Sequence, residues 1–271
     1  MVKRVVKIPG LPRRRRDGHK GDYGTVLLVA GSHGMLGAAI LAARGALRGG
    51  AGLVRACLPL SLVTPFTVAV PSATSLPRTG SPGRWLRGVD AVVVGPGLST
   101  ATSSRNLVRA VLRSSGAPMV LDADGLNVLG PLKGKLSAKA PVILTPHPGE
   151  AARLLRLEKV ELQADREAAA LELATRSGRI AVLKGARTIV TDGTRMFVNR
   201  TGNPGLGTGG SGDVLAGLLG SLLAQGMDPF DAACLGVNVH GAAGDLVAAR
   251  LSEPGLIAED LPLAIAEVLG R

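Results

Sequence analysis

Short apolar runs alternate with segments of helical spacing through most of the chain. Each run is four to six residues long and is rich in Val, Leu, Ile or Ala, and most of them lead into a glycine or a polar residue. Runs of this kind predict buried strands, and strands that alternate with helices predict a parallel sheet packed against helices. The pattern therefore predicts an α/β fold. We expect strands at 25–30, 53–57, 90–94, 119–122, 142–145 and 180–183, and helices at 37–47, 105–112, 162–176, 212–225, 229–251 and 258–269.

Two segments depart from this alternation. Residues 188–191 and 195–199 flank Asp192-Gly193, a dipeptide typical of tight hairpin turns. The stretch 61–87 is less regular and includes five prolines when Pro59 is counted. We expect this stretch to cross an edge of the domain.

A glycine-rich or polar motif directly follows most of the predicted strands. In an open α/β sheet, the carboxyl ends of the strands border one crevice in which ligands bind. We therefore expect these motifs to converge on one site, although each is a weak signal alone. They are Gly31-Ser32, Gly95-Pro96-Gly97, Asp122 to Asn127, Thr145 to Glu150 and Lys184-Gly185.

The stretch from Asn203 to Asp213 has five glycines among eleven residues and runs directly into an apolar helix. Glycines leave backbone N–H groups open to a ligand, and a helix N-terminus favours negative charge. The loop therefore predicts a site for a phosphate or for a phosphoryl group in transit. Asp213 would be repelled by such an anion, so its presence is explained if it takes a proton from an attacking hydroxyl. A flexible linker before a core helix is the alternative.

Five further side chains could carry chemistry, and each has a structural alternative. Glu150 could hold Mg2+ through water, or it could only stabilise the first turn of a helix. Lys184 could meet a phosphate or stay solvated, and His147 could contact a substrate or simply lie in an exposed loop. Asp122 and Asp124 could bind a metal or ligand hydroxyls, or they could only form a turn.

Composition changes this picture little. Hydrophobic residues make up 46% of the 271 residues and aromatic residues only 2%, so Ala, Val, Leu and Ile must build the core of one large domain. No run of 18 apolar residues occurs, the first residues lack the apolar core of a signal peptide, and Cys57 and Cys234 have no metal spacing. We expect no membrane span and a cytoplasmic protein with two reduced thiols.

The net charge of +12 is concentrated at the start of the chain. Residues 1–20 hold eight Lys or Arg and one Asp, which accounts for +7. A nucleic-acid arm would explain Arg13 to Arg16, but no aromatic residues interleave and no recognisable nucleic-acid module follows. We expect instead a flexible basic leader over 1–17, a single domain over 18–271, and no nucleic-acid partner.

Taken together, the motifs closely resemble those of the ADP/ATP-dependent NAD(P)H-hydrate dehydratases of the ribokinase-like superfamily. The similarity covers about residues 18–270, is specific as a combination, and does not include the basic leader. It implies a three-layer α/β/α sandwich with a mostly parallel central sheet. It is carried, in order, by Lys20 to Gly24, Gly31-Ser32, Gly50 to Val54, Gly95 to Leu98, Asp122 to Asn127, Thr145 to Glu150, Lys184-Gly185 and Asn203 to Asp213.

The resemblance implies a reaction that repairs nicotinamide nucleotides. The hydrated dinucleotide, (6S)-NAD(P)HX, would be phosphorylated at its ring hydroxyl by ADP or ATP with Mg2+, and loss of the phosphate would restore NAD(P)H. The family further implies a homotetramer that works with a separate NAD(P)HX epimerase, because we expect no room in this chain for the N-terminal epimerase domain of bifunctional relatives. Ser211, where many members have Thr, keeps a small hydroxyl.

The same resemblance implies specific residue roles. Asp213 would be the catalytic base, and Gly210, Ser211 and Gly212 would supply amides of the anion hole. Glu150 would hold Mg2+ through water. Ala38, Gly97, His147 and Asp213 would contact NAD(P)HX, and Lys184, Gly185, Ala186, Arg187, Thr188 and Gly212 would hold the adenine nucleotide.

Two other functions stay open on the sequence alone. A vitamin-precursor kinase of the same superfamily, of the hydroxyethylthiazole or hydroxymethylpyrimidine type, shares the glycine loop and the base but leaves the phosphate on its product. The motifs Asp122 to Asn127 and Thr145 to Glu150 favour the dehydratase. A nucleotide-binding regulator without turnover would gain nothing from the carboxylate of Asp213.

Overall fold

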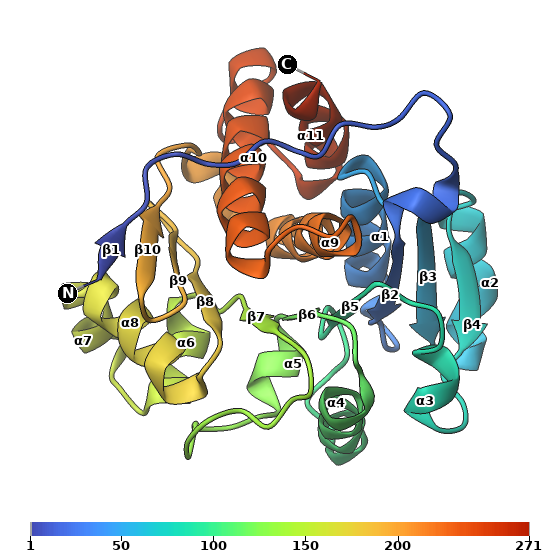
Figure 1. Cartoon of the computed structure of the whole chain (residues 1–271), viewed down its shortest axis with the longest axis horizontal. Coiled ribbons are helices and arrows are strands. Elements are labelled where there is room, and N and C mark those ends of the chain that lie inside the picture. Colours follow the sequence, from blue (N-terminus) through green and yellow to red (C-terminus); the bar gives the residue numbers. More distant parts are fainter. Residues whose placement is uncertain (1, 271) are drawn as a thin grey trace.

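The computed structural model describes residues 2–270, which form one ten-stranded sheet between two layers of helices (Figure 1). The strand order is β1-β10-β9-β8-β7-β6-β5-β2-β3-β4, and only the pairs β8–β9 and β9–β10 are antiparallel within these residues. The predicted three-layer α/β/α sandwich with a mostly parallel sheet is confirmed. The strands are β1 Lys3–Arg4, β2 Thr25–Val29, β3 Leu53–Leu58, β4 Thr74–Pro77, β5 Ala91–Val94, β6 Met119–Leu121, β7 Val142–Leu144, β8 Ile180–Leu183, β9 Ile189–Thr191 and β10 Arg195–Val198.

Side chains that alternate along the strands build two cores, one on each face of the sheet. In β2, Val26 and Leu28 belong to one cluster of buried residues, and Leu27 and Val29 belong to the other. Helices α1, α2, α9, α10 and α11 contribute to the first cluster, and α3 to α8 contribute to the second (Figure 1). The helices are α1 Leu36–Arg48, α2 Leu60–Ala69, α3 Pro82–Trp85, α4 Thr102–Ser114, α5 Asp124–Asn127, α6 Pro148–Leu155, α7 Lys159–Ala164, α8 Arg166–Ser177, α9 Ser211–Ala224, α10 Pro229–Arg250 and α11 Leu261–Leu269, with 3-10 turns η1 Lys20–Tyr23, η2 Pro204–Gly207 and η3 Ala258–Asp260.

The connections reverse direction at β2. This strand pairs with β3 on one side and with β5 on the other, so the chain moves outward to β4 and then returns across β2. In an open α/β sheet, the loops that leave the carboxyl ends of the strands at such a reversal border the ligand crevice. The loops after β2 and β5 meet there, where the N–H of Gly31 donates to the carbonyl of Pro96 at 2.8 Å.

Two of the predicted elements were wrong in detail. The stretch 61–87 is more regular than expected, because it contains helix α2, the short helix α3 and strand β4. Pro65 lies inside α2, and the fully buried Phe66 beside it anchors the helix to the core. The expectation that the stretch crosses an edge of the domain agrees with the position of β4, which is the last strand of the sheet.

The helix predicted over 162–176 is two helices, α7 and α8, which meet at Asp165. The backbone of Asp165 is not helical, with φ −140° and ψ 84°. Its carboxylate accepts a hydrogen bond from the N–H of Ala168 at 2.9 Å and so caps α8. Aspartate favours this position over a helix interior because its side chain replaces a missing backbone partner.

Helix α10 is the one helix among residues 2–270 that is long and apolar enough to cross a membrane. Of its most apolar window, 67% is buried inside the protein. It packs against α9 and α11 in the first core (Figure 1). Its apolar character is therefore accounted for by its place in that core.

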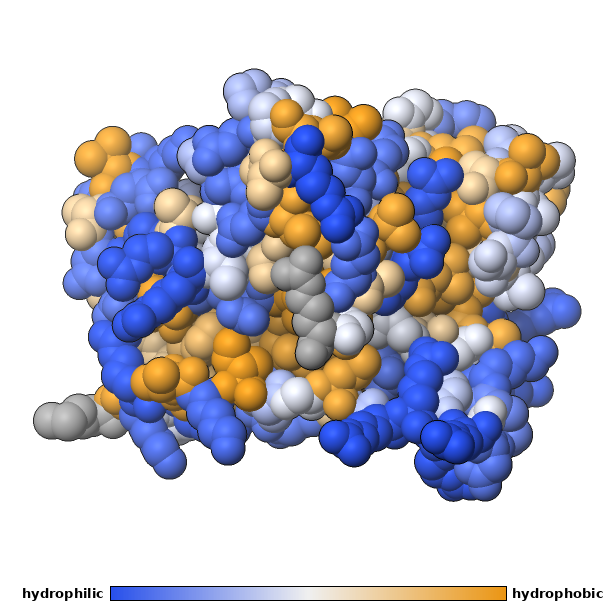
Figure 2. Space-filling view, turned by 90° about the horizontal axis from the view of Figure 1, so that it is seen from above, coloured by the Kyte–Doolittle hydropathy of each residue, from blue (hydrophilic) through white to orange (hydrophobic). Residues whose placement is uncertain are grey.

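The basic leader contacts the domain at both of its ends. Strand β1 extends the sheet beside β10, and the Arg4 guanidinium is paired with the Glu167 carboxylate. Farther along, the guanidinium carbon of Arg14 lies 4.1 Å from the centroid of the Tyr23 ring. Seen from above, hydrophilic residues form a dense cluster at the lower right, where the leader turns toward η1 (Figure 2). The flexibility of the leader stays a prediction.

Helices α1 and α9 approach so closely that side chains at two glycines are excluded. A Cβ at Gly217 of α9 would lie 1.9 Å from the carbonyl oxygen of Ala42, and one at Gly45 of α1 would lie 2.3 Å from that of Val214. Backbone carbonyls cannot move aside as flexible side chains can. The contact therefore fixes the position of α9 against α1.

We expect Gly217→Ala to lower the free energy of unfolding by about 1–3 kcal/mol, because the methyl group overpacks this contact. Gly37→Ala is the matched control, since Gly37 lies in α1 with nothing within 4 Å of its missing Cβ. There the gain in helix propensity should stabilise by up to about 1 kcal/mol. Urea denaturation of both variants measures the difference, and equal stabilities would contradict the close approach.

Candidate functional site

Of the five polar motifs that were expected to converge, those after β6, β7 and β8 line one cavity, whereas Gly31-Ser32 and Gly95-Pro96-Gly97 do not line it. It has a volume of about 810 Å3 and lies at the carboxyl ends of β6, β7 and β8, facing the start of α9 and one side of α10. Ligand pockets typically measure about 300–1,000 Å3. The lining includes the predicted site residues His147, Glu150, Lys184, Gly185, Ala186, Arg187, Thr188, Gly210, Ser211, Gly212 and Asp213.

The glycine loop delivers free backbone amides to this cavity. Asn203 starts the turn η2 and accepts a hydrogen bond from the N–H of Gly205 at 3.0 Å. Gly210 then has φ +89°, and a Cβ there would lie 2.4 Å from Leu41 Cδ1. Helix α9 begins at Ser211 without a side-chain cap. Its first N–H groups therefore have no partner within the helix and suit an anion.

Lys184 is the cation at the centre of the site. Its Nζ lies 2.7 Å from Asp122 Oδ1, and that same oxygen accepts a hydrogen bond from Thr145 Oγ1 at 2.7 Å. A Cβ at Gly212 would lie 3.1 Å from Lys184 Nζ, so the lysine reaches the first turn of α9. Asp122 is only 1% exposed. The possibility that Lys184 stays solvated is therefore wrong for this structure.

Three carboxylates, those of Asp122, Glu150 and Asp213, surround this one lysine. Burial raises the pKa of Asp213 to about 7, with a further increase from the charge of Asp122 and an opposing effect from Lys184. Burial likewise raises the pKa of Glu150 to about 7. For Lys184, burial acts to lower the pKa, but the charges of Asp122 and Glu150 outweigh it and the pKa is raised. A carboxylate with a pKa near neutral pH is suited to accept a proton.

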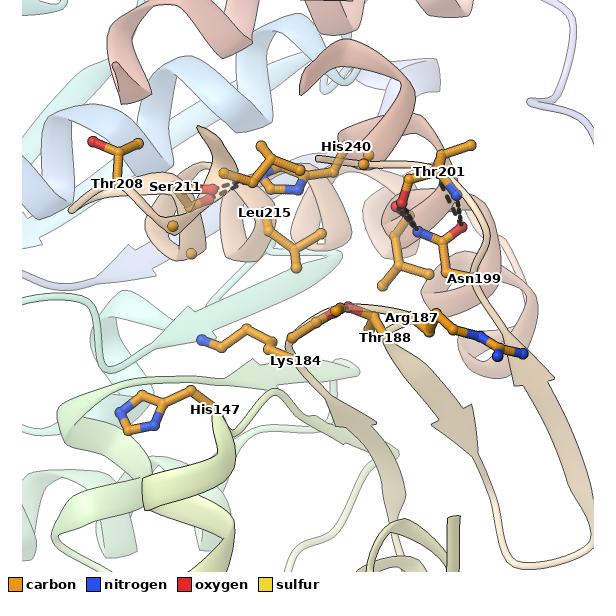
Figure 3. Close-up of a pocket in the computed structure, with 18 of the residues that line it drawn as sticks. His147, Lys184, Arg187, Thr188, Asn199, Thr201, Thr208, Ser211, Leu215 and His240 are labelled. Atoms are coloured by element: carbon orange, nitrogen blue, oxygen red, sulfur yellow. Dashed lines mark hydrogen bonds between the residues drawn. The ribbon is translucent and has the colours of Figure 1, made fainter. Parts of the chain in front are cut away.

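His147 and Glu150 hold each other at the start of α6. The Nδ1 of His147 accepts hydrogen bonds from the N–H groups of Gly149 and Glu150 at 3.0 and 3.3 Å, and Glu150 Oε2 accepts one from the N–H of His147 at 2.8 Å. Glu150 is thus a first-turn residue, as the structural alternative held, yet it is 4% exposed and lines the cavity. Burial lowers the pKa of His147, whose ring projects from the lower wall (Figure 3).

Ala38 and Gly97 lie together but do not line this cavity. A Cβ at Gly97 would lie 3.1 Å from Ala38 Cβ and 2.5 Å from the carbonyl oxygen of Met35. Gly97 has φ +61°, and the loop that carries it is fixed because the N–H of Ser99 donates to Asp124 Oδ2 at 2.8 Å. Asp122 and Asp124 therefore have different roles: Asp122 lines the cavity, whereas Asp124 supports the loop after β5.

The segment after β8 forms the wall of the cavity beside the β9–β10 hairpin. Gly185 has φ +129°, and its carbonyl accepts a hydrogen bond from Thr188 Oγ1 at 3.0 Å. The guanidinium of Arg166 donates to the carbonyls of Leu183 and Lys184 at 3.3 and 3.2 Å and so supports the turn. Arg187 and Thr188 lie along this wall (Figure 3).

Several residues of the site carry no sequence signal that we used. Asn199 and Thr201 follow the hairpin, and Val237, His240 and Gly241 come from the middle of α10. The guanidinium of Arg78, which follows β4, donates to the carbonyls of Ala30 and Gly31 at 3.2 and 2.9 Å and so fixes the loop after β2. A polar residue inside an apolar helix, such as His240, is the one signal that could have been found.

Within residues 2–270, no group of three or more His, Cys, Asp and Glu side chains is arranged to hold a metal ion directly.

Comparisons with known proteins agree with this geometry. A protein-family profile described as NAD(P)H-hydrate dehydratase matches residues 26–266. The chain is 40% identical over 259 residues to the ADP-dependent (S)-NAD(P)H-hydrate dehydratase of Neisseria meningitidis serogroup B, covering 91% of this chain and 85% of that one. It is 42% identical over 266 residues to the bifunctional NAD(P)H-hydrate repair enzyme Nnr of Moorella thermoacetica, covering 93% of this chain and 50% of the relative. The chain thus spans about half the length of such bifunctional relatives.

Among solved structures, the ADP/ATP-dependent NAD(P)H-hydrate dehydratase of Bacillus subtilis, co-crystallised with ATP and Mg2+, superposes with a TM-score of 0.89. The two chains are 33% identical in sequence, and the match covers 98% of this chain and 99% of that one. The similarity therefore extends over almost the whole chain.

Proposed function

Because the chain belongs to the NAD(P)H-hydrate dehydratase family, we propose that it restores NAD(P)H from (6S)-NAD(P)HX at the expense of ADP or ATP. The observation that carries the proposal is the placement of Asp213. Its carboxylate lies in the first turn of α9, beside amides that suit an anion, and burial raises its pKa to about 7. A group that only bound phosphate would gain nothing from a carboxylate there.

The reaction divides into two steps. In the first, Asp213 accepts the proton of the ring hydroxyl, whose oxygen attacks the terminal phosphorus of the nucleotide; a phosphoryl group moves to the ring, and AMP leaves when the donor is ADP. In the second, the phosphate leaves with its C–O bond pair, and the ring loses a proton to restore its double bond. The amides of Gly210 to Gly212 would stabilise the negative charge on the phosphoryl oxygens.

The two ligands would approach Asp213 from different sides. Lys184 to Thr188 line the wall of the cavity beside the hairpin and would hold the adenine nucleotide, with Gly212 next to Lys184 Nζ. Ala38 and Gly97 lie together outside this cavity, and His147 projects from its lower wall. These three residues would contact NAD(P)HX, whose reacting hydroxyl must meet the phosphorus near Asp213.

Glu150 fits the role of a carboxylate that holds Mg2+ through water. Its oxygens are the hard ligands that this ion prefers, and Oε2 already accepts the N–H of His147. The other oxygen lies 3.5 Å from His147 Nε2 and can accept a hydrogen bond from a coordinated water. When bound, Mg2+ would neutralise charge on the nucleotide phosphates.

The direct test is absorbance at the reduced-nicotinamide band, with hydrated NADH, Mg2+ and either ADP or ATP. A rise that depends on one nucleotide would establish the dehydratase and name its donor. The matched control omits the nucleotide. No rise with either donor would contradict the proposal, and consumption of nucleotide with a vitamin precursor would then identify a kinase.

The rate should depend on pH in one direction. Asp213 must be unprotonated to accept a proton, and its raised pKa of about 7 means that it is largely protonated below neutral pH. We therefore expect kcat/KM to rise with pH, with a midpoint near 7. Because Glu150 titrates in the same range, the midpoint belongs to the coupled pair. A profile that is flat from pH 5 to 8 would contradict the role of Asp213.

We further propose a cytoplasmic homotetramer that works with a separate NAD(P)HX epimerase. The support is the family resemblance, together with the exposed apolar side chains of Leu60 and Val68 on α2. Light scattering after gel filtration measures the mass of the assembly. A monomeric mass at micromolar concentration would contradict this part of the proposal.

A further inference from the structure

His240 is a buried polar residue of the cavity for which the proposed reaction has no role yet. It lies on α10, faces the start of α9, and is 8% exposed (Figure 3). Its Nε2 lies 3.0 Å from the backbone oxygen of Ser211 and 3.3 Å from Ser211 Oγ. Ser211 is the first residue of α9, between the glycines of the anion site.

The ring of His240 is neutral near pH 7. Burial lowers its pKa to about 4; the hydrogen bond to the Ser211 backbone opposes this shift, and the charge of Lys184 adds to it. A neutral imidazole has one N–H group and one acceptor nitrogen. The contacts of Nε2 therefore decide which nitrogen carries the proton.

These contacts fix the tautomer. A carbonyl oxygen can only accept a hydrogen bond, so the contact of 3.0 Å with Ser211 requires the proton on Nε2 of His240. The Ser211 hydroxyl oxygen lies beside the same N–H, which means that it faces a donor. Its own proton must then point away from His240. No second partner is recorded for Ser211 Oγ among residues 2–270, and Ser211 lines the cavity.

We propose that His240 is a positioning residue of the anion hole. Its Nε2–H faces the hydroxyl oxygen of Ser211 and thereby directs the Ser211 hydroxyl proton into the cavity. There the hydroxyl donates a hydrogen bond to the phosphoryl group in transit. This inference rests on the proposed phosphoryl transfer at Asp213 and adds a side-chain donor to the backbone amides. A donor that is aligned before the ligand arrives costs no reorganisation during the reaction.

The same N–H also fixes the backbone of α9. The carbonyl of Ser211 belongs to the first turn, so the hydrogen bond ties the N-terminus of α9 to the middle of α10. The two contacts can be separated by substitution. Ser211→Ala removes the hydroxyl and keeps the carbonyl contact, whereas His240→Leu removes both, and His240→Gln keeps an amide donor at a similar reach.

The experiment uses the full chain in the dehydratase assay, with kcat and the KM for the nucleotide measured for each single variant and for the double variant H240L/S211A. Removal of one anion-hole donor typically lowers kcat by about 10²-fold or more. We expect Ser211→Ala and His240→Leu each to lower kcat by about 10- to 100-fold with a smaller change in KM. The kcat of the double variant should be no lower than that of the slower single variant. His240→Gln should retain most of the kcat that His240→Leu loses.

A direct measurement of the ring separates this inference from the proposed function. Nitrogen-15 NMR of the wild-type protein should show His240 neutral at pH 7 with the proton on Nε2. An active wild type with the proton on Nδ1, or losses that multiply in the double variant, would overturn the role of His240 and leave it as a core residue. If His240→Leu does not fold, His240→Gln carries the test: activity as low as that of Ser211→Ala would overturn it. A wild type that never turns over hydrated NADH would instead overturn the proposed function.

Discussion

Replacement of Asp213 by asparagine is expected to lower kcat by about 10²- to 10⁴-fold, the usual contribution of a general base. Asparagine has nearly the same shape, so the amides at the start of α9 and the contact of Lys184 with Asp122 should persist. Binding of ADP, measured by titration calorimetry, should change little, or strengthen slightly because a negative charge beside the anion site is removed. Turnover equal to that of the wild type would end the assignment of Asp213 as the base.

The stability of the same variant provides an independent check. The pKa of Asp213 in the folded protein is about 7, whereas an aspartate in an unfolded chain titrates near ~3.9. Because the folded state binds the proton more tightly, this group stabilises the fold at low pH, and that contribution is lost as the pH rises to 7. Asparagine cannot ionise, so the variant should have a higher Tm than the wild type at pH 8 and a similar Tm near pH 4. A lower Tm at pH 8 would contradict the raised pKa.

The sequence predicted the site well where the chemistry follows directly after a strand. The motifs at Asp122, Glu150 and Lys184 reach one cavity because parallel strands place their carboxyl ends at the same edge of the sheet. Local sequence is sufficient there, since each motif carries its own turn residues.

The sequence was less informative where long-range packing decides. The two-residue strand β1 pairs with β10, which lies far from it in the sequence, and α2 continues through Pro65 next to the buried Phe66. His240 reaches the cavity from the middle of an apolar helix, and its polar side chain stands out there without indicating which site it faces. Such contacts depend on the arrangement of distant elements, which periodicity along one segment does not encode.

Lys184→Met is expected to be the most damaging substitution for stability in the site. Asp122 is 1% exposed, and without the lysine its charge would be left buried with Thr145 as its remaining recorded partner. Removal of one partner of a buried ion pair typically costs about 3–5 kcal/mol. Urea denaturation at pH 7 measures this loss.

The same variant should move the rate profile toward higher pH. The positive charge of Lys184 lowers the pKa values of Asp213 and Glu150, so its removal should raise both. The base would then be protonated over a wider range, and the residual kcat/KM should rise with a midpoint above that of the wild type. This shift separates an electrostatic role of Lys184 from a role in packing alone, which would lower stability without moving the profile.

The double variant K184M/D122N removes both charges of the buried pair. Asparagine removes the buried charge but still offers an oxygen to Thr145 Oγ1. We therefore expect it to recover most of the stability lost in Lys184→Met. Because Asp122 raises the pKa of Asp213 and Lys184 lowers it, loss of both charges should also return the midpoint toward its wild-type value. If Lys184→Met were as stable as the wild type and its profile unmoved, the lysine would be a solvated side chain, and the shared charge at this site would have to be assigned elsewhere.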